Sequence, residues 1–278
     1  MSMLLDQAQI LEKAALLPAF PTVVSDLLAS LEDDNSTLGI LSHLVAKDPV
    51  ITARILSLAN SAAMAGHGQQ DRRDIQGAVS LIGLARVREL ALSLSLNSFA
   101  EQFGVGRYFW THSVAVGVAA QELGRKYHFQ PDYALVAGLL HDIGQLWMVR
   151  FHPETWQQVQ REVMNWDRDI CEAERQFFGL DHTEVGKVLA EHWNLPASLI
   201  TAIAHHHDGH AAGDTLVAVT HVAEAIVNAL DLSAGNTSRV TVLSDQACDL
   251  LGIDWQEDFG FLFGKIEART EVLSAWFQ

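Results

Sequence analysis

The stretch Leu135–Gly144, LVAGLLHDIG, places a histidine and an aspartate directly after a run of apolar residues. Pro131 precedes this run and suits the first turn of a helix, so we expect a buried helix over Asp132–Leu140 that Gly144 ends in a left-handed conformation. A carboxylate near the core is costly without a partner, and a divalent cation would serve. His141 and Asp142 therefore predict a metal site, although a capping aspartate beside a packed histidine also fits this stretch.

Apolar residues recur at helical spacing along nearly the whole chain, and alternating β-branched runs are scarce. Acidic residues and prolines mark several helix starts. Asp48-Pro49 combines an N-cap with a proline at the first helical position, and Asp181 with Glu184 has the spacing of a capping box. The pattern predicts an all-α protein.

A change of composition at Glu101–Arg107, where two glycines follow an apolar helix, suggests a boundary between two parts. We expect a nearly neutral helical part over residues 1–106 and an acidic, histidine-rich helical domain over residues 107–278.

Charge and hydropathy exclude several classes of protein. The 278 residues carry a net charge of −16, so their surface repels phosphate backbones and we expect no nucleic-acid partner. No uncharged stretch exceeds 16 residues, which excludes a membrane-spanning helix. Asp6 interrupts the segment where a signal peptide needs its apolar core, so we expect a cytoplasmic protein. Cys171 and Cys248 are too few for a disulfide framework and are predicted to be buried free thiols.

Histidine is the most informative residue type. Eleven of the thirteen histidines lie between His112 and His221. Five predicted helices present a histidine or a carboxylate from an apolar face, and the candidate residues are His112, His141, Asp142, His182, His205, His206, His207 and Glu224. A lone buried histidine usually belongs to the core, but so many together favour a metal centre. Imidazole and carboxylate suit zinc, iron, nickel or manganese rather than calcium.

This arrangement resembles the HD superfamily of metal-dependent phosphohydrolases, whose pattern is H…HD…D. The resemblance implies that His112 is the first ligand, that His141 and Asp142 are the central pair, and that Glu224 replaces the final aspartate. His182 followed by Gly186 is similar to the H-x-x-x-G element of the dinuclear HD-GYP branch. His206-His207-Asp208 is similar to the HHE element of that branch. The resemblance thus implies one or two divalent ions held by His112, His141, Asp142, His182, His206, His207 and Glu224.

The N-terminal part makes the resemblance more specific. It contains Leu17-Pro18-x-x-Pro21, Lys47-Asp48-Pro49, Leu58-Ala59-Asn60-Ser61 and the run from Ala78 to Arg88. Together these motifs resemble the HDOD domain, a helical regulatory relative of the HD hydrolases found in bacterial signalling proteins. The resemblance covers about residues 17–208. It implies a multi-helical HD-like bundle preceded by a helical N-terminal subdomain.

Two functions of different class follow from the resemblance. In the first, the chain is a bacterial regulatory module that acts in trans on signalling proteins and holds a metal ion at its HD-like site. In the second, it is an active phosphohydrolase on a nucleotide or cyclic dinucleotide, with Asp142 as the bridging catalytic carboxylate. Gln145 stands where the HD-GYP branch usually has lysine, Glu224 is one methylene longer than the family's aspartate, and the GYP motif is absent. These departures favour the regulatory function.

Overall fold

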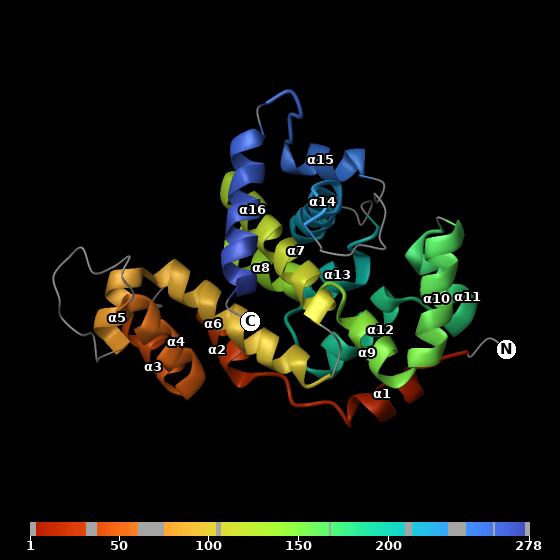
Figure 1. Ribbon diagram of the computed structural model, residues 1–278, viewed down its shortest axis with the longest axis horizontal. Coiled ribbons are helices and arrows are strands. Elements are labelled where there is room, and N and C mark those ends of the chain that lie inside the picture. The colour runs from red at the N-terminus through yellow and green to blue at the C-terminus, as the bar shows by residue number, and fades with distance from the viewer. Residues whose placement is uncertain are drawn as a thin grey trace. The chain divides into compact units, whose positions relative to one another are not determined.

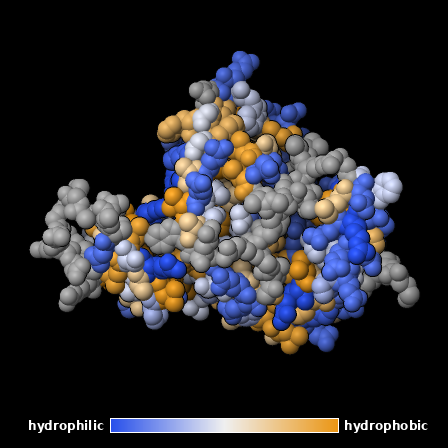
Figure 2. Space-filling view, in the orientation of Figure 1, coloured by the Kyte–Doolittle hydropathy of each residue, from blue (hydrophilic) through white to orange (hydrophobic). Residues whose placement is uncertain are grey.

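The computed structural model describes residues 4–31, 38–60, 75–103, 107–166, 168–208, 213–232, 243–257 and 259–275. Within these residues the chain forms helices joined by turns, and they contain no β-strand. The all-α prediction is confirmed. None of the described helices combines the length and apolar character needed to cross a bilayer. On the face seen in Figure 2, hydrophilic and hydrophobic residues are intermixed.

The chain forms two compact units, a small unit of Phe20–Phe99 and a large unit of Met1–Ala19 with Ala100–Gln278. The small unit contains α2 (Thr22–Leu31), α3 (Leu38–Ala46), α4 (Pro49–Ala59), α5 (Ile75–Ile82) and most of α6 (Leu84–Glu101). In it, α3 packs against α2, α4 and α5 (Figure 1).

The large unit holds all the candidate metal ligands. Its helices are α1 (Gln7–Ala14), α7 (Arg107–Lys126), α8 (Pro131–Leu140), α9 (Ile143–Phe151), α10 (Pro153–Trp166), α11 (Ile170–Phe178), α12 (His182–His192), α13 (Ala197–His205), α14 (Thr215–Ala229), α15 (Asp245–Leu251) and α16 (Gly260–Ala275).

Helix starts follow the local sequence closely. The Asp48 side chain accepts hydrogen bonds from the backbone N–H groups of Val50 and Ile51, as an N-cap does. Asp181 and Glu184 form the predicted capping box at the start of α12. Both predictions are confirmed, because a cap depends only on residues within one turn.

Helix α8 is the centre of the large unit. All its residues after Pro131 are buried, and it packs against α7, α13 and α14 (Figure 1). A Cβ atom added at Gly138 would lie 2.7 Å from the Gly117 Cα on α7, so the two glycines let these helix backbones approach closely. This approach brings α7, which carries His112, beside the end of α8, where His141 follows.

The N-terminal helix α1 belongs to the large unit. Leu5 N–H donates to the Phe178 carbonyl at 2.8 Å, and α1 packs on α12. Lys13 Nζ lies 2.8 Å from His152 Nε2. Burial and the neighbouring Lys13 charge lower the pKa of His152 to about 4, so His152 accepts this hydrogen bond as a neutral ring.

Residues 104–106 lie outside the described residues, and the expected boundary after residue 106 stays a prediction.

A buried carboxylate joins α16 to α7. Glu122, with a side chain only 2% exposed, pairs with Lys265 at 2.6 Å and also with Arg269 and Arg125. Burial by itself would raise the pKa of Glu122, but the hydrogen bond from Lys265 and the arginine charges lower the pKa below its usual value. Glu122 therefore stays ionised at neutral pH and stabilises the α16–α7 contact.

We expect Glu122→Ala to lower the free energy of unfolding by about 3 kcal/mol, because it removes the buried carboxylate with which Lys265, Arg269 and Arg125 all pair. Glu257→Ala is the matched control. Glu257 pairs with Lys126 at 2.8 Å, but its side chain is 56% exposed, so this variant is expected to unfold almost like the native chain. Urea unfolding measures both effects. Equal stability of the two variants would contradict this role for Glu122.

Candidate metal centre

The structure brings all seven predicted site residues together within the large unit. They come from α7, from the α8–α9 junction, from the start of α12, from the end of α13 and from the middle of α14. Their ligand atoms form two groups, each with its atoms within 4.8 Å of one another. The first cluster is Asp142, His182, His206 and His207, and the second cluster is His112, His141 and Glu224.

Asp142 faces both clusters. Its Oδ1 lies 3.2 Å from His182 Nε2 and 3.6 Å from His206 Nε2 in the first cluster. Its Oδ2 lies 3.3 Å from His141 Nε2 and 3.7 Å from His112 Nε2 in the second. Burial by itself would raise the pKa of Asp142, but the surrounding histidines lower the pKa well below its usual value. One ionised carboxylate thus presents one oxygen to each cluster.

Backbone contacts fix the orientation of two of the rings. The Nδ1 of His141 lies 2.8 Å from the Gly138 carbonyl oxygen, and the Nδ1 of His206 lies 2.9 Å from the Ile203 carbonyl oxygen. A carbonyl oxygen only accepts hydrogen bonds, so each Nδ1 carries a proton and, in the neutral ring, each Nε2 keeps its lone pair. Burial and the neighbouring His207 lower the pKa of His206 to about 3, which keeps this ring neutral.

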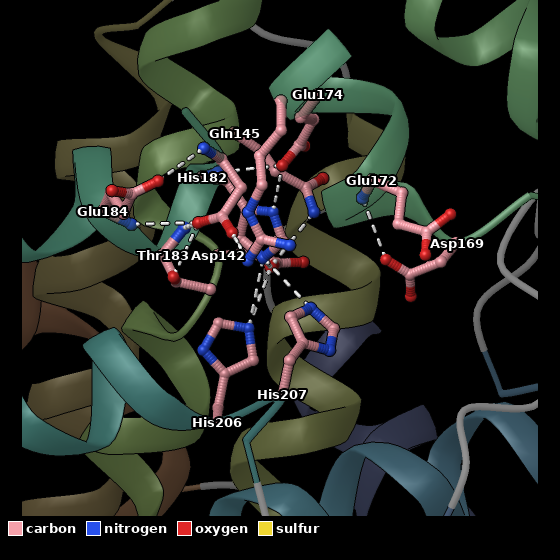
Figure 3. A network of polar contacts seen from close by, with 12 residues as sticks. Asp142, Gln145, Asp169, Glu172, Glu174, His182, Thr183, Glu184, His206 and His207 are labelled. Carbon is pink, nitrogen blue, oxygen red and sulfur yellow. Dashed lines mark hydrogen bonds and ion pairs between the residues drawn. The ribbon is translucent and has the colours of Figure 1, made fainter. Parts of the chain in front are cut away.

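Three imidazole nitrogens meet in the first cluster. His182 Nε2 lies 3.2 Å from His206 Nε2 and 3.1 Å from His207 Nε2, and Figure 3 shows both rings pointing at His182 and Asp142. Lone pairs at such distances repel unless a proton or a cation lies between them. Burial disfavours a charge on His182, yet nearby carboxylates raise its pKa well above the usual value. A proton or a metal ion between these nitrogens would remove the repulsion.

A second observation also fits a cation. His207 Nδ1 and Glu224 Oε2 are buried, lie 3.8 Å apart, and have no hydrogen-bond partner among the residues that the structure describes. Unpaired buried polar atoms cost about 1–3 kcal/mol each, and a metal ion would bind them. The donor set of imidazoles and carboxylates fits a divalent transition metal.

The HDOD domain family model matches residues 17–209 of the chain. The chain belongs to the HDOD domain family. The match confirms the resemblance drawn from the sequence over almost the same range.

Solved structures of similar proteins share the fold. An HDOD domain protein of unknown function from Geobacter sulfurreducens is 25% identical, with a TM-score of 0.77 over 96% of this chain and 97% of that chain. A protein from Shewanella amazonensis SB2B, named "Putative phosphohydrolase", is 26% identical, with a TM-score of 0.67 over 96% of each chain. An uncharacterized protein of Treponema pallidum (strain Nichols) is 26% identical over 213 residues, which are 72% of this chain. The match covers only 39% of that relative's length.

The structure separates the three consecutive histidines of this HDOD chain. His205 is exposed on α13, whereas His206 is buried and His207 is half-buried. Another histidine near the site, His221, has a different role. Its Nδ1 donates to the His206 carbonyl oxygen at 2.8 Å and its Nε2 accepts from the Ser244 N–H at 3.1 Å, so it holds the backbone of His206.

Two further side chains contact the candidate ligands, Gln145, which the sequence analysis named only as a departure from the HD-GYP pattern, and Glu174, which it missed. Gln145 Nε2 donates to Asp142 Oδ1 at 3.1 Å. Glu174, fully buried on α11, accepts from His182 Nδ1 at 2.6 Å. One sequence feature could have indicated Glu174: it lies on the apolar face of its helix, three residues after Cys171 and four before Phe178.

Cys171 and Cys248 are buried free thiols, as predicted.

The prediction that Gly144 ends α8 in a left-handed conformation is wrong. Gly144 lies in the first turn of α9, after the N-cap Asp142, and its backbone has no positive φ. A Cβ atom at Gly144 would overlap the His182 carbonyl oxygen and lie 2.8 Å from the Gly186 nitrogen. The residue is glycine because α9 and α12 approach closely here, and this approach places Asp142 beside His182.

We expect Gly144→Ala to destabilise the chain by about 1–3 kcal/mol, since the added methyl group pushes α12 away. The same displacement moves His182 from Asp142 and weakens metal binding. Gly264→Ala on α16 is the matched control: nothing lies within 4 Å of the added atom, and the change should stabilise the helix by about 0.5–1 kcal/mol. Thermal unfolding and chelator competition measure the two effects. If Gly144→Ala behaves like Gly264→Ala, the close approach is not essential.

Proposed function

We propose that the chain is a regulatory HDOD protein of bacterial signalling whose large unit holds a divalent-metal centre. The observation that carries the proposal is the position of Asp142, which directs one carboxylate oxygen to each of two donor clusters. The proposed ligands are His112, His141, Asp142, His182, His206, His207 and Glu224.

Charge supports metal binding at this place. Asp142 and Glu224 are both buried, and in the described part of the chain neither forms an ion pair with lysine or arginine. Burial by itself would raise the pKa of Glu224, but the nearby histidines lower the pKa to about 2. Two buried carboxylates without a permanent cation are costly, and one or two divalent ions would neutralise them.

The donor types restrict the metal to a divalent transition ion, which we take to be iron, manganese, zinc or nickel. When such ions are bound, they supply Lewis acidity and lower the pKa of bound water. The chain's own residues hold the site: the backbone carbonyls of Gly138 and Ile203 orient His141 and His206, and Gln145 holds Asp142 Oδ1.

The metal content of purified protein tests this proposal. We expect about one or two equivalents of a transition metal in the native chain and none in the His141→Ala/Asp142→Ala variant, since that variant removes ligands from both clusters. His205→Ala is the matched control, because His205 is exposed, and it should keep the native content. Plasma mass spectrometry gives the numbers. The absence of metal from all three proteins, after growth in supplemented medium, would overturn the metal centre.

Hydrolysis of a phosphate ester is the second candidate function. The same shared carboxylate favours it, because a pair of ions about 3.5–4 Å apart can hold the attacking and leaving oxygens of a phosphoryl transfer. A nucleotide or cyclic dinucleotide is the proposed substrate class. Against it stands Gln145, whose neutral amide is already hydrogen-bonded to Asp142 and supplies no charge for a phosphate.

Turnover distinguishes the two functions. For the regulatory protein we expect the metal-loaded native chain to hydrolyse bis(p-nitrophenyl) phosphate and cyclic dinucleotides no faster than Asp142→Asn does. Product formation followed by absorbance and chromatography measures this. Turnover that a chelator abolishes and that Asp142→Asn lacks would establish the hydrolase instead.

A regulatory role also requires protein partners, which we propose act in trans. Affinity capture with the full chain as bait tests this part of the proposal. Recovery of no protein above background would count against it.

A further inference from the structure

Glu174 is a buried carboxylate directly behind one candidate ligand. It lies on α11 with no exposed surface, and its Oε2 accepts from both the backbone N–H of His182 at 2.8 Å and His182 Nδ1 at 2.6 Å. Figure 3 shows Glu174 on one side of the His182 ring and both His206 and His207 on the other. His182 is thus held between Glu174 and the centre of the first cluster.

The hydrogen-bond acceptor at His182 Nδ1 is a carboxylate, unlike the acceptors at the neighbouring rings. His141 and His206 have their Nδ1 atoms against backbone carbonyls, which are neutral acceptors. A hydrogen bond to a carboxylate is roughly twice as strong as one between neutral groups. A carboxylate behind a ligating histidine also fixes the ring orientation and makes the ring a better electron donor.

The two clusters also differ in their donors. The first offers three imidazoles and Asp142 Oδ1, while the second offers two imidazoles, Glu224 and Asp142 Oδ2. Exposure does not separate the two clusters, because His207 in the first is 16% exposed and His112 in the second is 12% exposed. Glu174 adds a further buried carboxylate beside the first cluster alone, since its hydrogen bonds and ion pair in the described part of the chain are with His182.

We propose that Glu174 is a positioning residue for His182 and that it makes the first cluster the tighter of two metal positions. This inference rests on the proposed metal centre. The second cluster then holds the ion that exchanges more readily. Glu174 acts through His182 and donates no ligand atom to this position.

A merely structural role for Glu174 must be separated from this one, because Glu174 also binds the first N–H of α12. Glu174→Gln makes the separation: the amide oxygen can accept both hydrogen bonds, but the negative charge is lost. Glu172→Gln is the matched control on the same helix, with a side chain 63% exposed and placed apart from the cluster in Figure 3. Without metal, Glu172→Gln should keep the native midpoint of thermal unfolding, whereas Glu174→Gln should lower it, because it removes a buried charge that pairs with His182.

The test is a titration of metal-free full-length protein with Zn²⁺ against a competing chelator. We expect the native chain to bind in two steps of unequal affinity. Glu174→Gln should weaken the tighter step by about 10–100-fold and leave the looser step unchanged. Glu172→Gln should match the native chain in both steps. Two equal native steps, or identical behaviour of the two variants, would overturn the inference.

Ligand variants assign the steps without relying on Glu174→Gln. His141→Ala should lose the looser step and His206→Ala the tighter one. The reverse assignment would overturn the inference even if Glu174→Gln does not fold. If the native chain binds a single ion, the same assignment applies: loss in His206→Ala supports the inference, and loss only in His141→Ala overturns it. Native protein that binds no Zn²⁺ would instead overturn the proposed function.

Discussion

The buried carboxylate of Asp142 is the constraint on which the arrangement of the large unit depends. It lies at the junction of α8 and α9, below the protein surface, and its charge has to be balanced there. Among the described residues, this charge is balanced by the adjacent His141 and by histidines from other helices rather than by lysine or arginine. A histidine ring can gain or lose a proton, so the number of protons on these rings changes when a cation binds beside them. Metal binding and the packing of these helices are therefore linked.

Close backbone contacts make the convergence possible. Gly138 lets α8 approach α7, and Gly144 lets α9 approach α12. A side chain at either glycine would separate helices that carry opposite sides of the centre. The ligand atoms within each cluster lie within 4.8 Å of one another, so a shift of an ångström would be a large change. Gly138 and Gly144, on either side of His141 and Asp142, are therefore needed for the geometry of the site although they donate no ligand atom.

Much of the fold and most of the candidate site could be predicted from the sequence. The N-cap of Asp48 and the capping box of Asp181 and Glu184 depend on neighbours within one turn, and both were correct. Gly144 was assigned wrongly because a glycine required by a helix crossing looks the same in sequence as one required by a left-handed turn. Glu174 was missed because it belongs to no motif and acts through a ring eight residues further along the chain.

The sequence by itself determined that the chain is all-α, that it belongs with HDOD domains, and which histidines and carboxylates are candidates for a metal centre. Helical periodicity, capping and motif spacing are local properties, so they can be read along one dimension. Only the tertiary structure decided that Asp142 faces two clusters, that His205 points away while His206 and His207 point inward, and that Glu174 stands behind His182. These facts depend on the distances between atoms of separate helices, which are set by packing rather than by sequence spacing.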